Sequence, residues 1–110
     1  MKEAPAIVYK LTHIETERFY VGVTTKPLGL RFSAHMSGMR LGNHQNRRLR
    51  SAWTGLKRHW KIEPLVTVPF EFRFEAERAY MEMLRPDLNE MVPWRPGAPK
   101  LNMNRYLKFF

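Results

Sequence analysis

Cysteine is absent from this chain of 110 residues. Its absence excludes disulfide bonds, thiolate zinc sites and cysteine nucleophiles together. Long apolar runs are also missing, since no stretch approaches the roughly 20 residues of a membrane-spanning helix. The first ten residues, MKEAPAIVYK, lack the apolar core of a signal peptide. We therefore expect a cytoplasmic protein that does not span a membrane.

Acidic residues are scarce relative to basic ones. Ten Asp and Glu stand against nineteen Lys and Arg, which gives a formal net charge of +9 and a sequence pI near 10.4. The hydrophobic share of 44% is ordinary for a globular protein, so the chain can form one folded domain. A balance this basic favours polyanionic partners, with nucleic acid first and anionic membrane second.

Apolar residues that alternate with polar ones predict two strands, over Ala6–Thr12 and Arg18–Thr24. The polar stretch between them is typical of the loop of an antiparallel hairpin. Pro27 then opens a short helix that we expect to end near Met36, before a Ser-Gly pair.

The rest of the chain predicts two more helices and one more strand. The apolar spacing indicates a helix over about Gln45–His59, a strand over Leu65–Phe72 with residues 66, 68, 70 and 72 on one face, and a helix over Phe72–Leu84. The order β-β-α-α-β-α predicts an α+β fold: a small three-stranded antiparallel sheet flanked by helices, with an irregular Pro-rich C-terminal tail.

A glutamate lies where the third helix should be apolar. Wound as a helix, this segment places Glu77 in an apolar arc between Phe74 and Tyr80, with Arg78 and Glu82 on the opposite side. A carboxylate rarely takes such a position unless it is paired or holds a metal. The alternative is a glutamate at the rim of the core that reaches solvent or pairs with an arginine.

Two tyrosines, Tyr9 and Tyr20, face each other in the predicted hairpin. Each tyrosine alone is more often a packing residue with a solvated hydroxyl. Gly22 is less usual, because glycine weakens a strand interior unless something must approach the backbone. Arg31 and His35 lie one turn apart on the first helix and, taken alone, look like ordinary solvated residues.

Basic side chains crowd one face of the second helix and the segment before it. Such a face can be only a soluble surface or can bind phosphates, and the sequence leaves both interpretations open. The candidates for nucleic-acid contact are Arg40, His44, Arg47, Arg48, Arg50, Lys57 and Arg58.

Together these residues resemble the GIY-YIG nuclease superfamily. The matching parts are IVY at 7–9, YVG at 20–22, Arg31 and His35 in RFSAH, and Glu77 in FEAERAYMEMLRPDLN. The spacing is similar to that of the phage homing-endonuclease branch, including GNHQNRRLRSAW at 42–53, and the resemblance covers roughly Ile7 to Asn89. The first signature reads IVY rather than GIY, but its tyrosine is present.

The resemblance implies a divalent-metal-dependent endonuclease that hydrolyses phosphodiester bonds in DNA. Glu77 would hold one ion, Mg²⁺ or Mn²⁺, with water and substrate phosphate completing its coordination. Arg31 would clamp the scissile phosphate, and Tyr20 would position water or phosphate. Tyr9 would take a proton from the attacking water or orient that water, and His35 is the other candidate base or a proton shuttle.

The expected partner is DNA, with RNA less favoured, and the protein would act as a monomer or transient dimer in a bacterial or phage-infected cell. Asn89 would touch the phosphate or cap a chain turn. Because the first signature lacks its glycine, a catalytically inactive nucleic-acid-binding module of the same fold is the alternative. We assign residues 1–90 to the nuclease domain and 91–110 to a tail that packs on it or acts as an arm. A third reading is an accessory protein that docks through Trp94, Tyr106, Phe109 and Phe110.

Overall fold

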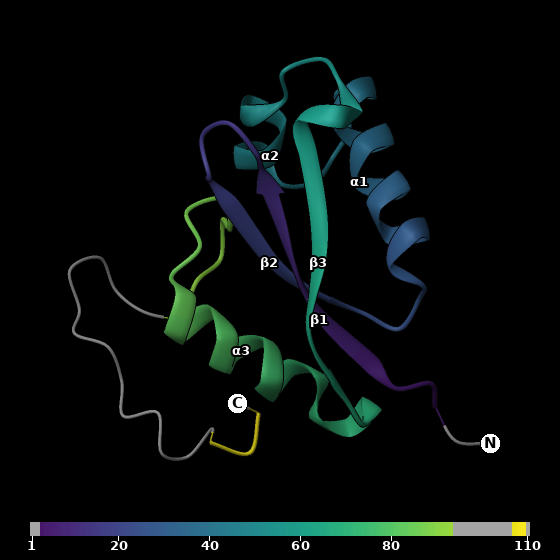
Figure 1. Ribbon diagram of the computed structural model, residues 1–110, viewed down its shortest axis with the longest axis vertical. Coiled ribbons are helices and arrows are strands. Elements are labelled where there is room, and N and C mark those ends of the chain that lie inside the picture. Colours follow the sequence, from purple (N-terminus) through teal and green to yellow (C-terminus); the bar gives the residue numbers. More distant parts are fainter. Residues whose placement is uncertain (1–2, 94–106, 110) are drawn as a thin grey trace.

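The computed structural model describes residues 3–93 and 107–109, and within them forms an antiparallel sheet of three strands (Figure 1). The strands are β1 (Ala6–His13), β2 (Phe19–Thr24) and β3 (Trp60–Val68), in the order β2-β1-β3. The hairpin predicted from the sequence is present, because β1 and β2 are antiparallel neighbours. The predicted α+β fold is confirmed.

Helices cover both faces of the sheet, with α1 (Leu28–Leu41) and α2 (Arg47–Ala52) on one face and α3 (Arg73–Leu84) on the other (Figure 1). Side chains alternate along β1, so Val8 packs in the α3 layer and Tyr9 in the α1 layer. The central strand therefore contributes to two buried clusters at once, which explains why both of its faces carry apolar residues.

Helix α1 is longer than predicted, since it continues past the Ser-Gly pair to Leu41. Met39 lies one turn beyond His35 and is buried against the sheet, so the apolar stripe extends further than the sequence reading allowed. The helix ends at Gly42, whose φ of 75° is left-handed and whose N–H binds the carbonyls of Gly38 and Met39.

Helix α2 is shorter than predicted, and the helix expected over about Gln45–His59 is wrong in its length. Asn46 caps the helix by accepting a hydrogen bond from the Leu49 amide at 3.0 Å. Gly55 has a φ of 92°, which takes the chain out of helical geometry. A short 3₁₀ turn at Lys57–His59 then leads directly into β3.

Strand β3 begins earlier and ends earlier than predicted. It pairs with β1 from Trp60 to Val68, and Pro64 is accommodated because β3 is an edge strand with a register shift opposite Tyr9. Phe70–Phe72 forms a 3₁₀ turn rather than strand. The prediction that residues 66, 68, 70 and 72 share one face is therefore wrong, because Pro69 ends the ladder.

Helix α3 faces the sheet with the stripe 76, 79, 80 and 83, which follows helical spacing. This rotation leaves Phe74 63% exposed and Glu77 half-buried on the flank. Glu82, expected on the solvent side, is instead fully buried, and Nη2 of Arg85 lies 3.9 Å from its carboxylate. Sequence periodicity thus located the helix and missed its exact rotation.

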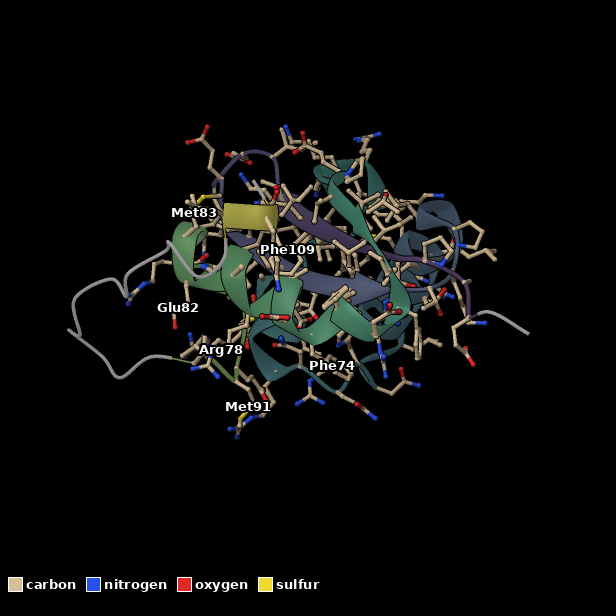
Figure 2. The ribbon with its side chains drawn as sticks, turned by 90° about the horizontal axis from the view of Figure 1, so that it is seen from below. Phe74, Arg78, Glu82, Met83, Met91 and Phe109 are labelled. Atoms are coloured by element: carbon tan, nitrogen blue, oxygen red, sulfur yellow. The ribbon has the colours of Figure 1, made fainter. Side chains whose placement is uncertain are left out.

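Phe109 lies against α3, where the Tyr80 hydroxyl donates a hydrogen bond of 2.8 Å to its carbonyl oxygen (Figure 2). In the same view Phe74, Arg78 and Met91 lie on the opposite, lower side of the molecule. The other three aromatic residues of the proposed docking tail lie outside the described residues. No helix among the described residues is long and apolar enough to cross a membrane.

Candidate active site

The two tyrosines of the hairpin lie side by side over Gly22. Tyr9 is paired with Gly22 across the β1–β2 ladder, and the rings of Tyr9 and Tyr20 are 6.2 Å apart at 45°. A Cβ atom on Gly22 would lie 2.6 Å from the Tyr9 hydroxyl and 2.7 Å from the Tyr20 ring. The sequence indicated that something approaches the backbone here, and the structure identifies it as the tyrosine pair.

Replacing Gly22 with alanine should therefore disturb the site directly. The added methyl group overlaps both tyrosines in a buried position, which should cost about 1–3 kcal/mol of stability. The Tyr9 hydroxyl would also be displaced from its hydrogen-bond partners. The rate of the cleavage implied by the sequence resemblance should therefore fall by more than the loss of folded protein explains. Urea denaturation and a plasmid-nicking assay measure the two effects.

Gly29→Ala is the matched control, since a Cβ atom there meets nothing within 4 Å. In the first turn of α1 this change should be neutral or stabilise by about 0.5–1 kcal/mol. Equal behaviour of the two alanine variants would contradict the packing of the tyrosines over Gly22.

Ile7, which replaces the glycine of the GIY signature, lies within a regular part of β1. It is paired with Thr24 on β2 and with Thr67 on β3. The isoleucine therefore leaves the strand intact on both sides, two residues before Tyr9.

Two side chains of α1 contact the Tyr9 hydroxyl. Tyr9 is fully buried, and its oxygen lies 2.7 Å from Nε2 of His35. Nε of Arg31 donates a hydrogen bond to the same oxygen at 3.1 Å. Because Arg31 and His35 are one turn apart on α1, the helix presents both side chains to one strand residue.

His44 lies behind His35 and not on the outer basic face predicted for it. The two imidazole rings meet edge to edge and are nearly coplanar, with centroids 5.0 Å apart and an interplanar angle of 13°, and Nδ1 of His35 is 2.8 Å from Nε2 of His44. Gly38 permits this approach, since a Cβ atom there would lie 3.2 Å from the His44 side chain. No local sequence pattern predicts this pair, because a sharp turn at Gly42 brings the two histidines together.

Burial dominates the electrostatics of these groups. It raises the pKa of Tyr9 and of Tyr20, so both phenols are protonated at neutral pH in the protein alone. Burial, and then the nearby Arg31 charge, lowers the pKa of His35 to about 3, and the same two causes lower the pKa of His44. His35 is therefore neutral at physiological pH.

Glu77 approaches the tyrosines from the other layer. It shares a hollow of about 280 Å³ with Tyr20, and its charge is the second cause, after burial, that raises the pKa of Tyr20. Arg31 lowers the pKa of Tyr20 from the other side. Tyr20 thus lies between Arg31 of α1 and Glu77 of α3, at the β2 edge of the sheet.

The Glu77 carboxylate forms no hydrogen bond or ion pair with any residue in 3–93 or 107–109. Burial raises its pKa, and no positive group or donor in the described part of the chain offsets the loss of solvation. A half-buried carboxylate of this kind is suited to a cation that the protein itself does not supply.

The oxygen ligands around Glu77 suit a magnesium ion better than a zinc ion. No cluster of three or more His, Cys, Asp or Glu able to hold a metal occurs in the described part of the chain. The hollow also contains oxygen-bearing side chains of Asn46, Asn89 and Glu90. Mg²⁺ usually binds through one or two carboxylates and retains several waters, which one glutamate in an open hollow can satisfy.

Asn89 lies at the outer edge of β2 and uses both ends of its amide there. Its Oδ1 accepts from the Val21 amide at 2.9 Å, and its Nδ2 donates to the Val21 carbonyl at 2.8 Å. Asp87 and Leu88 bond the Phe19 amide and carbonyl in the same way. Of the two roles predicted for Asn89, the geometry favours the structural one.

Four of the other predicted nucleic-acid contacts line two different hollows. Arg47 pairs with Glu90 at 3.4 Å, and Nη1 of Arg48 donates to the Asp87 carbonyl at 2.9 Å. Both arginines line an open hollow of about 630 Å³ on the side of residue 87. A separate hollow of about 270 Å³ is lined by Arg40 and Lys57. Of the remaining two, the half-buried Arg50 acts on the pKa of His44, and Arg58 is exposed.

Sequence reasoning missed a cationic hollow that adjoins Arg31. It measures about 370 Å³ and is lined by Lys26, Arg31 and Arg73, with the exposed ring of Phe74 at its border. The guanidinium of Arg73 is held 3.6 Å from the Phe70 ring and 4.3 Å from the Phe74 ring. An arginine flanked by three phenylalanines over residues 70–74 was the available signal.

The tyrosine-bearing hairpin, Arg31 on α1 and Glu77 on the opposite helical layer are the parts that the sequence resemblance led us to expect. Residues 5–89 match the family model of the GIY-YIG catalytic domain, and the chain belongs to that family. The resemblance to the GIY-YIG superfamily that the sequence motifs indicated is confirmed by this match.

Among solved structures, the chain is similar to the catalytic domain of the intron endonuclease I-TevI, in a glutamate-to-alanine mutant form. The TM-score is 0.66 and the identity 17%, with 74% of this chain and 84% of that chain covered. At this identity the likeness shows the fold. A comparison with curated proteins gives no match.

Proposed function

We propose that this protein is an active, divalent-metal-dependent DNA endonuclease. The observation that carries the proposal is the half-buried carboxylate of Glu77, which has no partner among the described residues and lines the hollow that holds Tyr20, with Arg31 and Tyr9 on the other side of that tyrosine. This arrangement offers a cation ligand, a phosphate clamp and a phenol around one space. The net charge of +9 supports a polyanionic substrate.

Arg31 has two tasks in this proposal. Its Nε donates to Tyr9, and its terminal nitrogens, which that bond does not use, bind the scissile phosphate. A cation held by Glu77 would stabilise negative charge on the phosphate and on the leaving oxygen. Tyr20, placed between Arg31 and Glu77, orients the phosphate or the attacking water.

Tyr9 accepts the proton of the attacking water. The water oxygen bonds to phosphorus, its proton moves to the Tyr9 phenolate, and the bond from phosphorus to the leaving sugar oxygen breaks, with solvent protonating that oxygen. Burial raises the pKa of Tyr9 in the protein alone, while Arg31 lowers it. The charge of a divalent cation held by Glu77 would lower it further, so the phenol would release its proton to solvent before the attack and act as a phenolate.

The experiment that tests this function is cleavage of supercoiled plasmid with Mg²⁺, with Mn²⁺ and with EDTA. We expect nicked or linear DNA with either ion and none with EDTA, and weaker cleavage of RNA of equal length. Binding without products under all three conditions would instead favour the inactive binding module. The logarithm of its association constant should fall with the logarithm of the salt concentration, with a slope of about −0.9 per phosphate neutralised.

A further inference from the structure

We propose that His44 is a positioning residue that makes His35 a hydrogen-bond donor to Tyr9, so that His35 stabilises the Tyr9 oxygen and does not take its proton. This inference rests on the proposed function for its catalytic meaning. The hydrogen-bond directions themselves follow from the structure and can be tested without DNA.

A backbone amide determines the tautomer of His44. The Asn46 N–H lies 3.0 Å from Nδ1 of His44. A backbone N–H can only donate, so Nδ1 of His44 must accept and carries no proton. Neutral His44 then has its single proton on Nε2. A doubly protonated His44 would place an N–H against the amide N–H, which the geometry disfavours.

The tautomer of His44 determines the tautomer of His35. Nε2 of His44 lies 2.8 Å from Nδ1 of His35, so the proton on His44 is donated there and Nδ1 of His35 is an acceptor. Because His35 is neutral, its own proton is on Nε2, which lies 2.7 Å from the Tyr9 oxygen. His35 is therefore the donor in that bond.

The Tyr9 oxygen consequently accepts two hydrogen bonds, since Nε of Arg31 can only donate as well. The phenolic proton must then point away from both donors, toward Tyr20 and the substrate side. When that proton leaves, the phenolate retains two aimed donors and nothing has to reorient, which is the preorganisation that favours a charged intermediate. Of the two candidate bases that the sequence left open, this arrangement selects Tyr9.

The hydrogen bonds from the Asn46 amide through His44 and His35 to Tyr9 form a relay, and the fold fixes its Asn46 end. Asn46 is itself fixed, because its Nδ2 donates to the Leu88 carbonyl at 2.9 Å and its Oδ1 caps α2. The His44 ring is packed against Gly38 and lies edge to edge with the His35 ring. The amide that sets the tautomers is thus part of a helix cap and not of a loose loop.

Tautomers can be read directly from long-range ¹H–¹⁵N correlation spectra of the full ¹⁵N-labelled chain, which has only four histidines. We expect the Nε2–H tautomer for both His35 and His44 in metal-free buffer at pH 7. A His35 found as the Nδ1–H tautomer would overturn the inference, whether or not the protein cleaves DNA.

Two variants separate positioning from packing. His44→Phe retains an aromatic ring against Gly38 and removes both nitrogens, so His35 should shift to a mixture of tautomers and kcat should fall on the order of 10- to 100-fold, with little change in KM. His44→Gln can accept from the Asn46 amide and donate to His35, so it should restore much of both properties. Thermal unfolding checks that each variant is folded.

The outcomes distinguish this inference from the proposed function. An unchanged His35 tautomer in folded His44→Phe would overturn the relay even if the parent protein is an active nuclease. The expected tautomers in a parent protein that cuts no substrate would support the relay and contradict the proposed function.

Discussion

Glu77→Gln should abolish metal-dependent cleavage, with a loss on the order of 1,000-fold or more in initial nicking rate. The amide keeps the size of the side chain and removes the charge that holds a divalent cation. DNA affinity, measured by fluorescence anisotropy, should remain within severalfold of the parent value, because the basic residues are unchanged.

The matched control is Glu75→Gln, two residues earlier on α3. Glu75 is exposed and lies 3.5 Å from Nζ of Lys108, so its loss removes only a surface ion pair. Nicking by this variant should match the parent. Similar rates for Glu77→Gln and the parent would exclude Glu77 as the metal ligand.

Stability should respond to Glu77→Gln in the opposite direction to activity. Burial raises the pKa of Glu77 above its unfolded value, so the folded state binds this proton more tightly than the unfolded state does. The parent therefore loses stability as pH rises through that interval, and at neutral pH the variant should have the higher Tm in metal-free buffer. Added Mg²⁺ should raise the Tm of the parent and leave that of the variant unchanged.

Arg31→Lys should reduce cleavage by roughly 100- to 1,000-fold although the positive charge is retained. Lysine has no planar fork, so it cannot donate to the Tyr9 oxygen through one nitrogen while binding two phosphate oxygens through others. The loss should appear mainly in kcat, measured on a short fluorescent duplex at saturating Mg²⁺.

Arg18→Lys is the control for that substitution. Arg18 is half-exposed and pairs with Asp87 at 2.8 Å, at the far end of β2 from Arg31. Exposed ion pairs are worth about 0–1 kcal/mol, so cleavage should change little. Equal losses in the two lysine variants would indicate a general effect on DNA binding and not a specific role of Arg31.

The sequence predicted which candidate site residues lie close together better than it predicted the boundaries of the elements around them. Tyr9 and Tyr20 were placed correctly because a hairpin is specified by local alternation and a short loop. Arg31 and His35 were placed together because helical spacing alone puts them one turn apart. To place Glu77 near these residues, it was enough to predict that α3 exists and roughly how it is rotated.

Non-local contacts decided the rest. The ends of β3 depend on pairing with β1, which no local pattern of Leu65–Phe72 contains. The burial of Glu82 and the exposure of Phe74 follow from how α3 is rotated against the sheet, which a helical wheel gives only approximately. His44 was assigned to the basic surface because its partner, His35, is reached only after the chain reverses at Gly42.

Both rims of the sheet are closed to strand addition by different means. At β2 the backbone groups of Phe19 and Val21 are taken by residues 87–89, and at β3 an exposed Pro64 interrupts the outer rim. Two copies therefore have no ready way to fuse their sheets into one continuous structure. If both strands of a duplex are to be severed together, the second copy has to be recruited through helical surfaces or by the DNA itself.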